Sequence, residues 1–131
     1  MSLKLRLKSE EKVLIGNAVI KNGSKSCEIT VENNIPILRQ KDIMTEAEAT
    51  SPARRVYFMI QLMYIDPESL ADYHARFWSL TEDILAAAPS TKPHISKISG
   101  QVLAKNYYQA LKLSRKLIEY EQELLAHVKS I

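Results

Sequence analysis

Leucine and cationic residues alternate at the start of the chain, in the order Leu3-Lys4-Leu5-Arg6-Leu7-Lys8. A period of two predicts a β-strand, because successive side chains of a strand point to opposite faces of the sheet. The leucines are therefore expected on a buried face and the cations on a solvated one.

Short apolar stretches follow at 13–15 and 18–20, and apolar residues alternate with polar ones over 27–31. The pairs Gly16-Asn17 and Asn22-Gly23 separate these segments. Both pairs favour hairpin turns, because glycine and asparagine tolerate a positive φ. Residues 36–39 begin with proline, which cannot donate to a central ladder and so predicts an edge strand. We expect a small antiparallel β-sheet or a partly open barrel within residues 1–44.

From residue 45 onward the apolar positions recur every three or four residues, which predicts helices. Thr45 and Glu48 fit a capping box, and Ser51-Pro52 and Asp66-Pro67 are typical helix starts. The region from His94 onward predicts one long helix or two abutting ones. The expected fold class is α+β, with a β lobe over residues 1–44 and a helical region over 45–131 packed with it as one unit.

Composition and charge narrow the class of protein. The chain has 131 residues, 46% of them hydrophobic and 25% charged, which is ordinary for a globular domain. No apolar run approaches the ~20 residues that cross a bilayer, and the first residues form no secretion signal, so we expect a cytoplasmic protein without a membrane partner. The net charge of +3 arises before Thr45, where eight cations face five anions.

The sequence shows no arrangement typical of catalysis. Its three histidines, His74, His94 and His127, fall in separate segments without a cysteine or an acidic residue at motif spacing. The single cysteine, Cys27, alternates with polar residues and is interpreted as a small buried residue rather than a nucleophile. We therefore expect no enzyme, no metal and no cofactor.

The cations are the candidate binding residues. Lys4, Arg6 and Lys8 would project from one strand face at about 6.6 to 7 Å, close to the phosphate spacing of an extended single strand. A charged edge strand that prevents aggregation is an equally good interpretation. Arg39 and Lys41 can extend this patch.

Arg54 and Arg55 open a predicted helix, where cations oppose the positive end of the helix dipole. An anionic ligand would explain this placement. An internal ion pair with Asp42, Glu46 or Glu48 explains it equally well.

Three segments carry a family resemblance: EKVLIGNAVIKNG at 11–23, ILRQKDIM at 37–44 and SPARRVYFMIQLMYIDP at 51–67. In this order they resemble the FlbT family of flagellum biosynthesis repressors. The resemblance implies a post-transcriptional regulator that binds the 5′ untranslated region of flagellin mRNA and promotes its degradation. It also implies the flagellar regulator FlaF as a functional counterpart, and it brings no catalytic residues.

The RNA-binding hypothesis combines this resemblance with the cations Lys4, Arg6, Lys8, Arg39, Lys41, Arg54 and Arg55. The alternative is a protein-interaction module that acts through its helical surface without RNA contact. Trp78 and the pair Tyr107-Tyr108 could present that surface to a flagellin-related protein, or to a second copy of the chain as a homo-oligomer.

Overall fold

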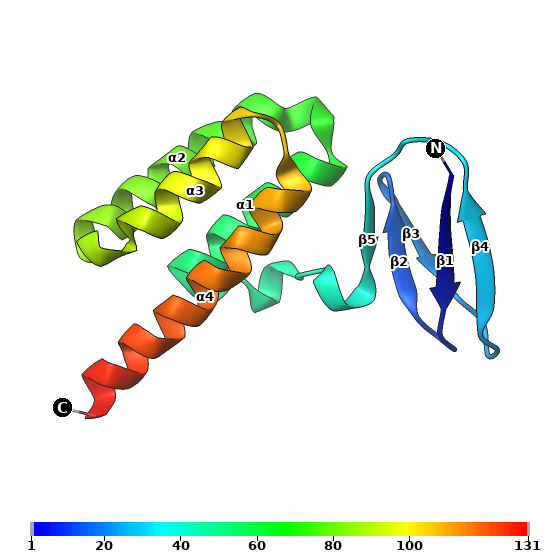
Figure 1. Ribbon diagram of the computed structural model, residues 1–131, viewed down its shortest axis with the longest axis horizontal. Helices are drawn as coiled ribbons and strands as arrows, with labels where there is room; N and C mark the ends of the chain where they lie inside the picture. Colours follow the sequence, from blue (N-terminus) through cyan, green and yellow to red (C-terminus); the bar gives the residue numbers. More distant parts are fainter. Residues whose placement is uncertain (1, 131) are drawn as a thin grey trace. The chain divides into compact units, whose positions relative to one another are not determined.

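The computed structural model describes residues 2–130 and has the predicted α+β fold, with strands followed by helices (Figure 1). It divides into two compact units, Met1–Ile43 and Met44–Ile131. The packing of both units into one body stays a prediction.

The first unit, the sheet unit, holds five strands in two antiparallel sheets. The strands are β1 (Leu3–Leu7), β2 (Lys12–Ile15), β3 (Ala18–Lys21), β4 (Cys27–Val31) and β5 (Ile37–Arg39). β1 pairs with β4, while β2 lies between β3 and β5, so β5 is an edge strand as predicted.

Apolar side chains from both sheets form one core in the sheet unit. Leu5, Leu7 and Val13 are buried at its centre, and apolar residues of β2, β4 and β5 pack against them. Leu5 and Leu7 of β1 therefore face inward and its cations face solvent, as the alternating pattern predicted, whereas Leu3 at the start of the strand is exposed.

The Gly16-Asn17 turn joins β2 to β3 as predicted, with Ile15 opposite Ala18. Gly16 has φ +60°, and a Cβ atom added there would lie 2.8 Å from Cδ1 of Ile35. Both the backbone conformation and the space favour glycine at this position.

The predicted hairpin at Asn22-Gly23 is wrong, because β3 and β4 belong to different sheets. Asn22 bridges two loops instead: its Nδ2 donates to the carbonyls of Lys8 (2.8 Å) and Lys25 (2.9 Å). The interpretation of Cys27 as buried is also wrong. Cys27 is exposed at the start of β4, where its thiol donates to Oδ1 of Asn22 over 3.3 Å.

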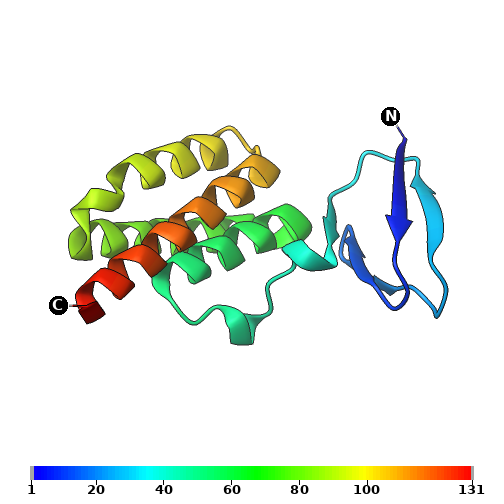
Figure 2. The ribbon, with the colours of Figure 1, turned by 60° about the horizontal axis from the view of Figure 1, so that its bottom comes forward.

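The second unit, the helical unit, contains α1 (Pro52–Ile65), α2 (Leu70–Ala87), α3 (Lys92–Leu103) and α4 (Tyr107–Ser130). α1 packs against both α2 and α4, and α3 packs against α4 (Figure 2). The core is apolar and includes the fully buried side chains of Ile60, Phe77, Ile98, Val102 and Leu117.

The predicted helix starts are confirmed at two positions and shifted at a third. Ser51 caps α1 by accepting from the Arg54 amide (3.3 Å), and Thr45 and Glu48 form the capping box of a short 3₁₀ helix. Asp66 precedes a 3₁₀ turn, but its side chain makes no capping hydrogen bond; its carboxylate accepts instead from the Tyr73 hydroxyl, which raises the pKa of that phenol. α2 consequently begins at Leu70, after a 3₁₀ turn.

The region after His94 forms two helices, one of the two predicted outcomes. Gly100 lies inside α3, and the break falls at Ala104–Asn106, where Lys105 has φ +61°. Lys105 therefore reverses the chain without glycine.

A buried glutamine fixes the segment before α1. Gln61 is 3% exposed; its Oε1 accepts from the Met44 amide (2.8 Å) and its Nε2 donates to the Met44 carbonyl (2.9 Å). These two hydrogen bonds satisfy the polar atoms of a buried side chain and the backbone polar groups of the loop.

Across residues 2–130, no helix has the length and apolar character that a membrane span requires.

Candidate nucleic-acid interface

The cations of β1 lie on its solvated face. Lys4, Arg6 and Lys8 are exposed, while the leucines between them are buried. In the ladder Lys4 lies opposite Thr30 and Arg6 opposite Glu28. Within the described part of the chain, neither the Lys4 amine nor the Arg6 guanidinium forms a hydrogen bond or ion pair. The face is cationic along β1, with one carboxylate beside it on β4.

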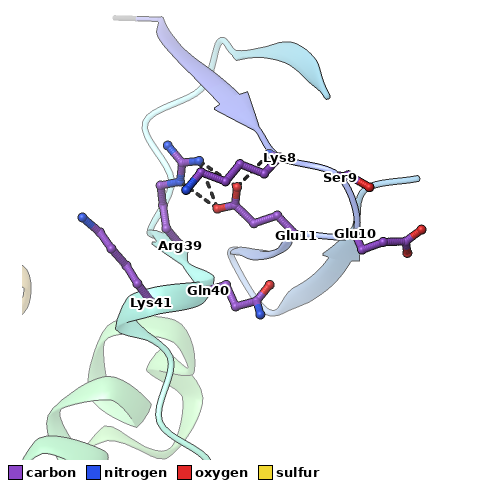
Figure 3. A pocket seen from close by; sticks show the side chains of 7 residues that line it. All are labelled: Lys8, Ser9, Glu10, Glu11, Arg39, Gln40 and Lys41. Atoms are coloured by element: carbon purple, nitrogen blue, oxygen red, sulfur yellow. Dashed lines mark hydrogen bonds and ion pairs between the residues drawn. The ribbon is translucent and has the colours of Figure 1, made fainter. Parts of the chain in front are cut away.

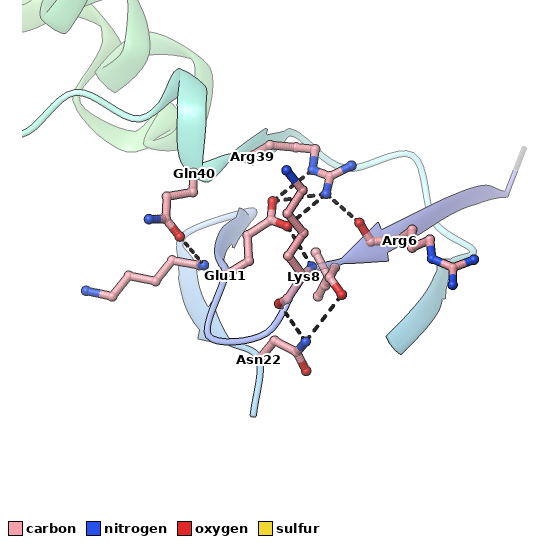
Figure 4. Close-up of polar contacts among 8 residues, drawn as sticks. Arg6, Lys8, Glu11, Asn22, Arg39 and Gln40 are labelled. Carbon is pink, nitrogen blue, oxygen red and sulfur yellow. Dashed lines mark hydrogen bonds and ion pairs between the residues drawn. The ribbon is translucent and has the colours of Figure 1, made fainter. Parts of the chain in front are cut away.

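Arg39, at the end of β5, is held inside the sheet unit. Its guanidinium contacts both carboxylate oxygens of Glu11 at 3.0 to 3.1 Å and donates to the carbonyl of Arg6 (Figure 4). This ion pair compensates the charge of Arg39, and its geometry ties β5 to the loop that follows β1. Arg39 is thus a positioning residue for the cationic strand.

The carboxylate of Glu11 is stabilised in its charged form. The backbone amide of Lys8 donates to its Oε1 over 2.9 Å, and this hydrogen bond, with the Arg39 guanidinium, holds the pKa of Glu11 below its usual value. The Arg39–Glu11 pair therefore persists through the neutral pH range.

A shallow hollow of about 620 Å³ beside this pair brings together three of the predicted cations. Lys8, Arg39 and Lys41 line it, and Lys8 and Lys41 are exposed (Figure 3). Glu10 and Glu11 lie on the same rim, so the hollow has mixed charge. Because Arg39 is paired with Glu11, the exposed positive charges of this hollow are those of Lys8 and Lys41.

The two arginines at the start of α1 lie in the helical unit, where an anion from α4 offsets their position. Oε2 of Glu121 accepts from the Ala53 amide over 2.9 Å, which places a carboxylate at the helix N-terminus. Arg54 is half-buried and contributes to the lowered pKa of Glu48, after the hydrogen bonds from the Thr45 amide and hydroxyl. Glu121 resolves the dipole conflict, and sequence reasoning did not identify it.

Arg55 lies on a groove between α1 and α2. The groove, of about 720 Å³, has an apolar floor that includes Phe58, Leu62 and Leu80. Arg55 and Arg76 both line it. Arg76 was missed by sequence reasoning, because its pairing with Asp72 at four residues' separation looks like an ordinary solvated helix pair.

Aromatic side chains accompany cations on α1 and α4 as well. Tyr108 is 41% exposed, with the Lys112 amine 5.0 Å from its ring centre and the Tyr64 ring 6.2 Å away. Arg115 lies over the buried Tyr57 ring at 5.3 Å. Tyr57 and Tyr108 are thus each engaged in a cation–π contact within the helical unit.

The predicted residues thus form two sets, one in each unit. Lys4, Arg6, Lys8, Arg39 and Lys41 belong to the sheet unit, and Arg54 and Arg55 belong to the helical unit. The chain is thus a small α+β protein that displays at least one of the predicted cations to solvent in each unit.

Comparison with known proteins places this architecture in a family. The family model described as "Flagellar protein FlbT" matches residues 3–125. The chain therefore belongs to the FlbT family of flagellar proteins.

Its relatives carry a regulatory name. The chain is 42% identical to the probable flagellum biosynthesis repressor protein FlbT 1 of Bradyrhizobium diazoefficiens, over 95% of its own length and 85% of the relative's. It is 39% identical to the flagellum biosynthesis repressor protein FlbT of Caulobacter vibrioides, over 99% and 94% of the two chains. These names support a repressor role in flagellar regulation. No solved structure matches the chain significantly.

Proposed function

We propose that this protein is a post-transcriptional repressor that binds the 5′ untranslated region of flagellin mRNA and promotes its degradation. The observation that carries the proposal is the row of exposed cations formed by Lys4 and Arg6 on β1 and by Lys8, which directly follows the strand. The repressor names of the relatives supply the regulatory context.

The row suits an RNA backbone for two reasons. The spacing of Lys4 and Arg6, about 6.6 to 7 Å, follows from the strand geometry and is close to that of successive phosphates in an extended strand. The buried Leu5 and Leu7 and the contacts of Arg39 with Glu11 and with the Arg6 carbonyl anchor the strand backbone, so the cations reach solvent from a fixed backbone. Sequence preference would come from unpaired bases and from the folded shape of the leader.

The protein acts here as a binding protein, in the cytoplasm, and a separate nuclease cleaves the transcript. This division needs no acid/base pair in the chain, consistent with the separate positions of the histidines in the sequence.

A salt titration tests the proposal directly. Binding to flagellin leader RNA should weaken with added salt, and replacing Lys4, Arg6 and Lys8 together with glutamine should reduce the logarithmic salt slope by about two units, because each phosphate contact contributes about 0.7. Glutamine at Lys92, Lys97 and Lys105 provides a control with equal charge loss on the helical unit. If the β1 variant keeps the affinity and slope of the original chain, the strand does not bind RNA.

A protein-interaction module is the second candidate. It is favoured by an apolar groove that lies between the start of α1, the end of α2 and α4. Pro52, Ile84, Leu117 and Leu124 line it, and Leu125 of α4 beside them is 54% exposed. A FlaF-like regulator or a second copy of this chain would bind there with little salt dependence. Salt-insensitive binding of such a protein, together with absent RNA binding, would favour this candidate.

A further inference from the structure

The α1–α2 groove combines features that fit a nucleotide. Residues 55, 58, 59 and 62 of α1 recur at three- and four-residue spacing, so they share one helix face, and Arg76 and Leu80 face them from α2. The apolar floor includes the half-buried Phe58, and guanidinium groups come from both helices. Such a groove offers a planar ligand an apolar surface and offers its phosphates two cations.

The charged groups of the groove are available to a ligand. In the part of the chain that the structure describes, the Arg55 guanidinium and the Glu46 carboxylate each lack a hydrogen-bond or ion-pair partner, although both line this groove. Arg76 contacts Asp72 at 3.3 Å, but the two side chains are 63% and 60% exposed. An exposed pair of this kind is weak, so a phosphate can replace the carboxylate.

Glu46 decides which class of anionic ligand fits. A groove for an acidic peptide would gain nothing from a carboxylate on its rim. A nucleobase differs, because adenine, cytosine and guanine carry an exocyclic amino group that a carboxylate can accept from, whereas uracil has none. Donors for phosphate and an acceptor for a base edge therefore occur around one apolar floor.

We propose that the α1–α2 groove binds one unpaired nucleotide of a single-stranded RNA, with the phosphate at Arg55 and Arg76, the base against Phe58, and an exocyclic amino group at Glu46. This inference rests on the proposed RNA-binding function and identifies a residue-level contact for it. It predicts a preference for bases that carry an amino group.

The test uses the full chain and fluorescently labelled RNA homopolymers of adenine, cytosine and uracil, each of about 12 nucleotides, a common site size for single strands. The original chain should bind the adenine and cytosine probes more tightly than the uracil probe. Arg76→Gln should weaken binding of all three, whereas Lys97→Gln, an exposed cation on α3, should have a smaller effect.

Glu46→Ala gives the decisive result, because two mechanisms predict opposite changes in the affinity for the adenine and cytosine probes. Removing a carboxylate strengthens a purely electrostatic attraction to RNA, so that mechanism predicts tighter binding to every probe. The base-recognition mechanism predicts about fivefold or more weaker binding to the adenine and cytosine probes, and unchanged or tighter binding to uracil. Glu123→Ala, an exposed glutamate on α4, provides the charge-matched control.

The outcomes separate this inference from the proposed function. Tighter binding of Glu46→Ala to all probes, equal to that of Glu123→Ala, overturns the nucleotide site while RNA binding itself stands. Unchanged RNA affinity of Arg76→Gln also overturns it and directs attention to a protein ligand for the groove. If the original chain binds neither the probes nor the flagellin leader, the proposed function fails as well. Circular dichroism of each variant establishes that the helical unit is folded.

Discussion

The carboxylate of Glu121 is predicted to stabilise the start of α1. It accepts from the amide of Ala53, a residue that is 1% exposed, at the helix end that also carries Arg54 and Arg55. Without Glu121, this amide loses its partner in a buried setting and the two arginines face an uncompensated helix dipole. The perturbation we propose is Glu121→Ala, with Glu121→Gln as a finer probe.

The expected magnitude follows from two contributions. A hydrogen bond to a charged group is worth about 1.5 to 3 kcal/mol, and a charge at a helix terminus contributes about 0.3 to 1 kcal/mol. Because Glu121 is half-exposed, we expect values near the lower limits, about 2 kcal/mol for Glu121→Ala. Glu121→Gln retains an acceptor for Ala53 and loses the charge, so it should cost about 1 kcal/mol.

Urea unfolding measures this loss in the helical unit specifically, because Trp78 of α2 is the chain's single tryptophan. A loss of about 2 kcal/mol should lower the urea midpoint by about 1 M for a typical small-domain slope. Glu123→Ala removes an exposed carboxylate from the same helix and should change stability by less than about 0.5 kcal/mol. If Glu121→Ala destabilises no more than Glu123→Ala, the explanation of the arginine placement is refuted.

Three further predictions concern the core of the helical unit, the Gly16 turn and the pH dependence of the Glu11 contacts. Phe77→Ala removes a fully buried ring and should cost about 3 to 5 kcal/mol by Trp78 fluorescence in urea; a loss below about 1 kcal/mol would contradict the packing. Gly16→Ala should destabilise the sheet unit by about 1 kcal/mol, measured by amide hydrogen exchange, because φ is +60°; equal protection would count against this turn. The lowered pKa of Glu11 stabilises the folded state above about pH 4.5, and this stabilisation is lost as the pH falls through the folded-state pKa. Glu11→Gln should therefore weaken protection of the Lys8 amide at pH 7, and this loss should shrink as the pH is lowered below about 4.5; a loss that is the same at every pH would refute the assignment.

Local patterns predicted the elements whose causes are local. The leucine alternation of β1, the Gly16 turn and the Ser51 cap depend on neighbouring residues only, and the structure confirms all three. The Asn22-Gly23 pair carried an equally strong turn signal and failed. Its outcome depends on distant carbonyls, since the Asn22 amide bonds to Lys8, fourteen positions earlier.

In the candidate site, too, features set by neighbouring residues could be predicted and features set by distant residues could not. That Lys4 and Arg6 share a solvated strand face follows from their period of two, whereas Lys8 is exposed but lies just beyond the end of β1. That Arg39 is neutralised by Glu11, 28 positions away, and that Glu121 lies at the start of α1, 68 positions after Ala53, follows only from the tertiary fold. Arg76 was invisible because its groove requires two helices to form.

The contact between Gln61 and Met44 has a practical consequence for dissecting the protein. The side-chain amide of Gln61 hydrogen-bonds both the backbone N–H and the carbonyl of Met44, which lies eight positions before the start of α1. A truncated polypeptide intended to retain only the four helices should therefore begin before Met44. One that begins after it would leave a buried amide without either bond, and its lower solubility or melting temperature would reflect the cut rather than any dependence on the strands.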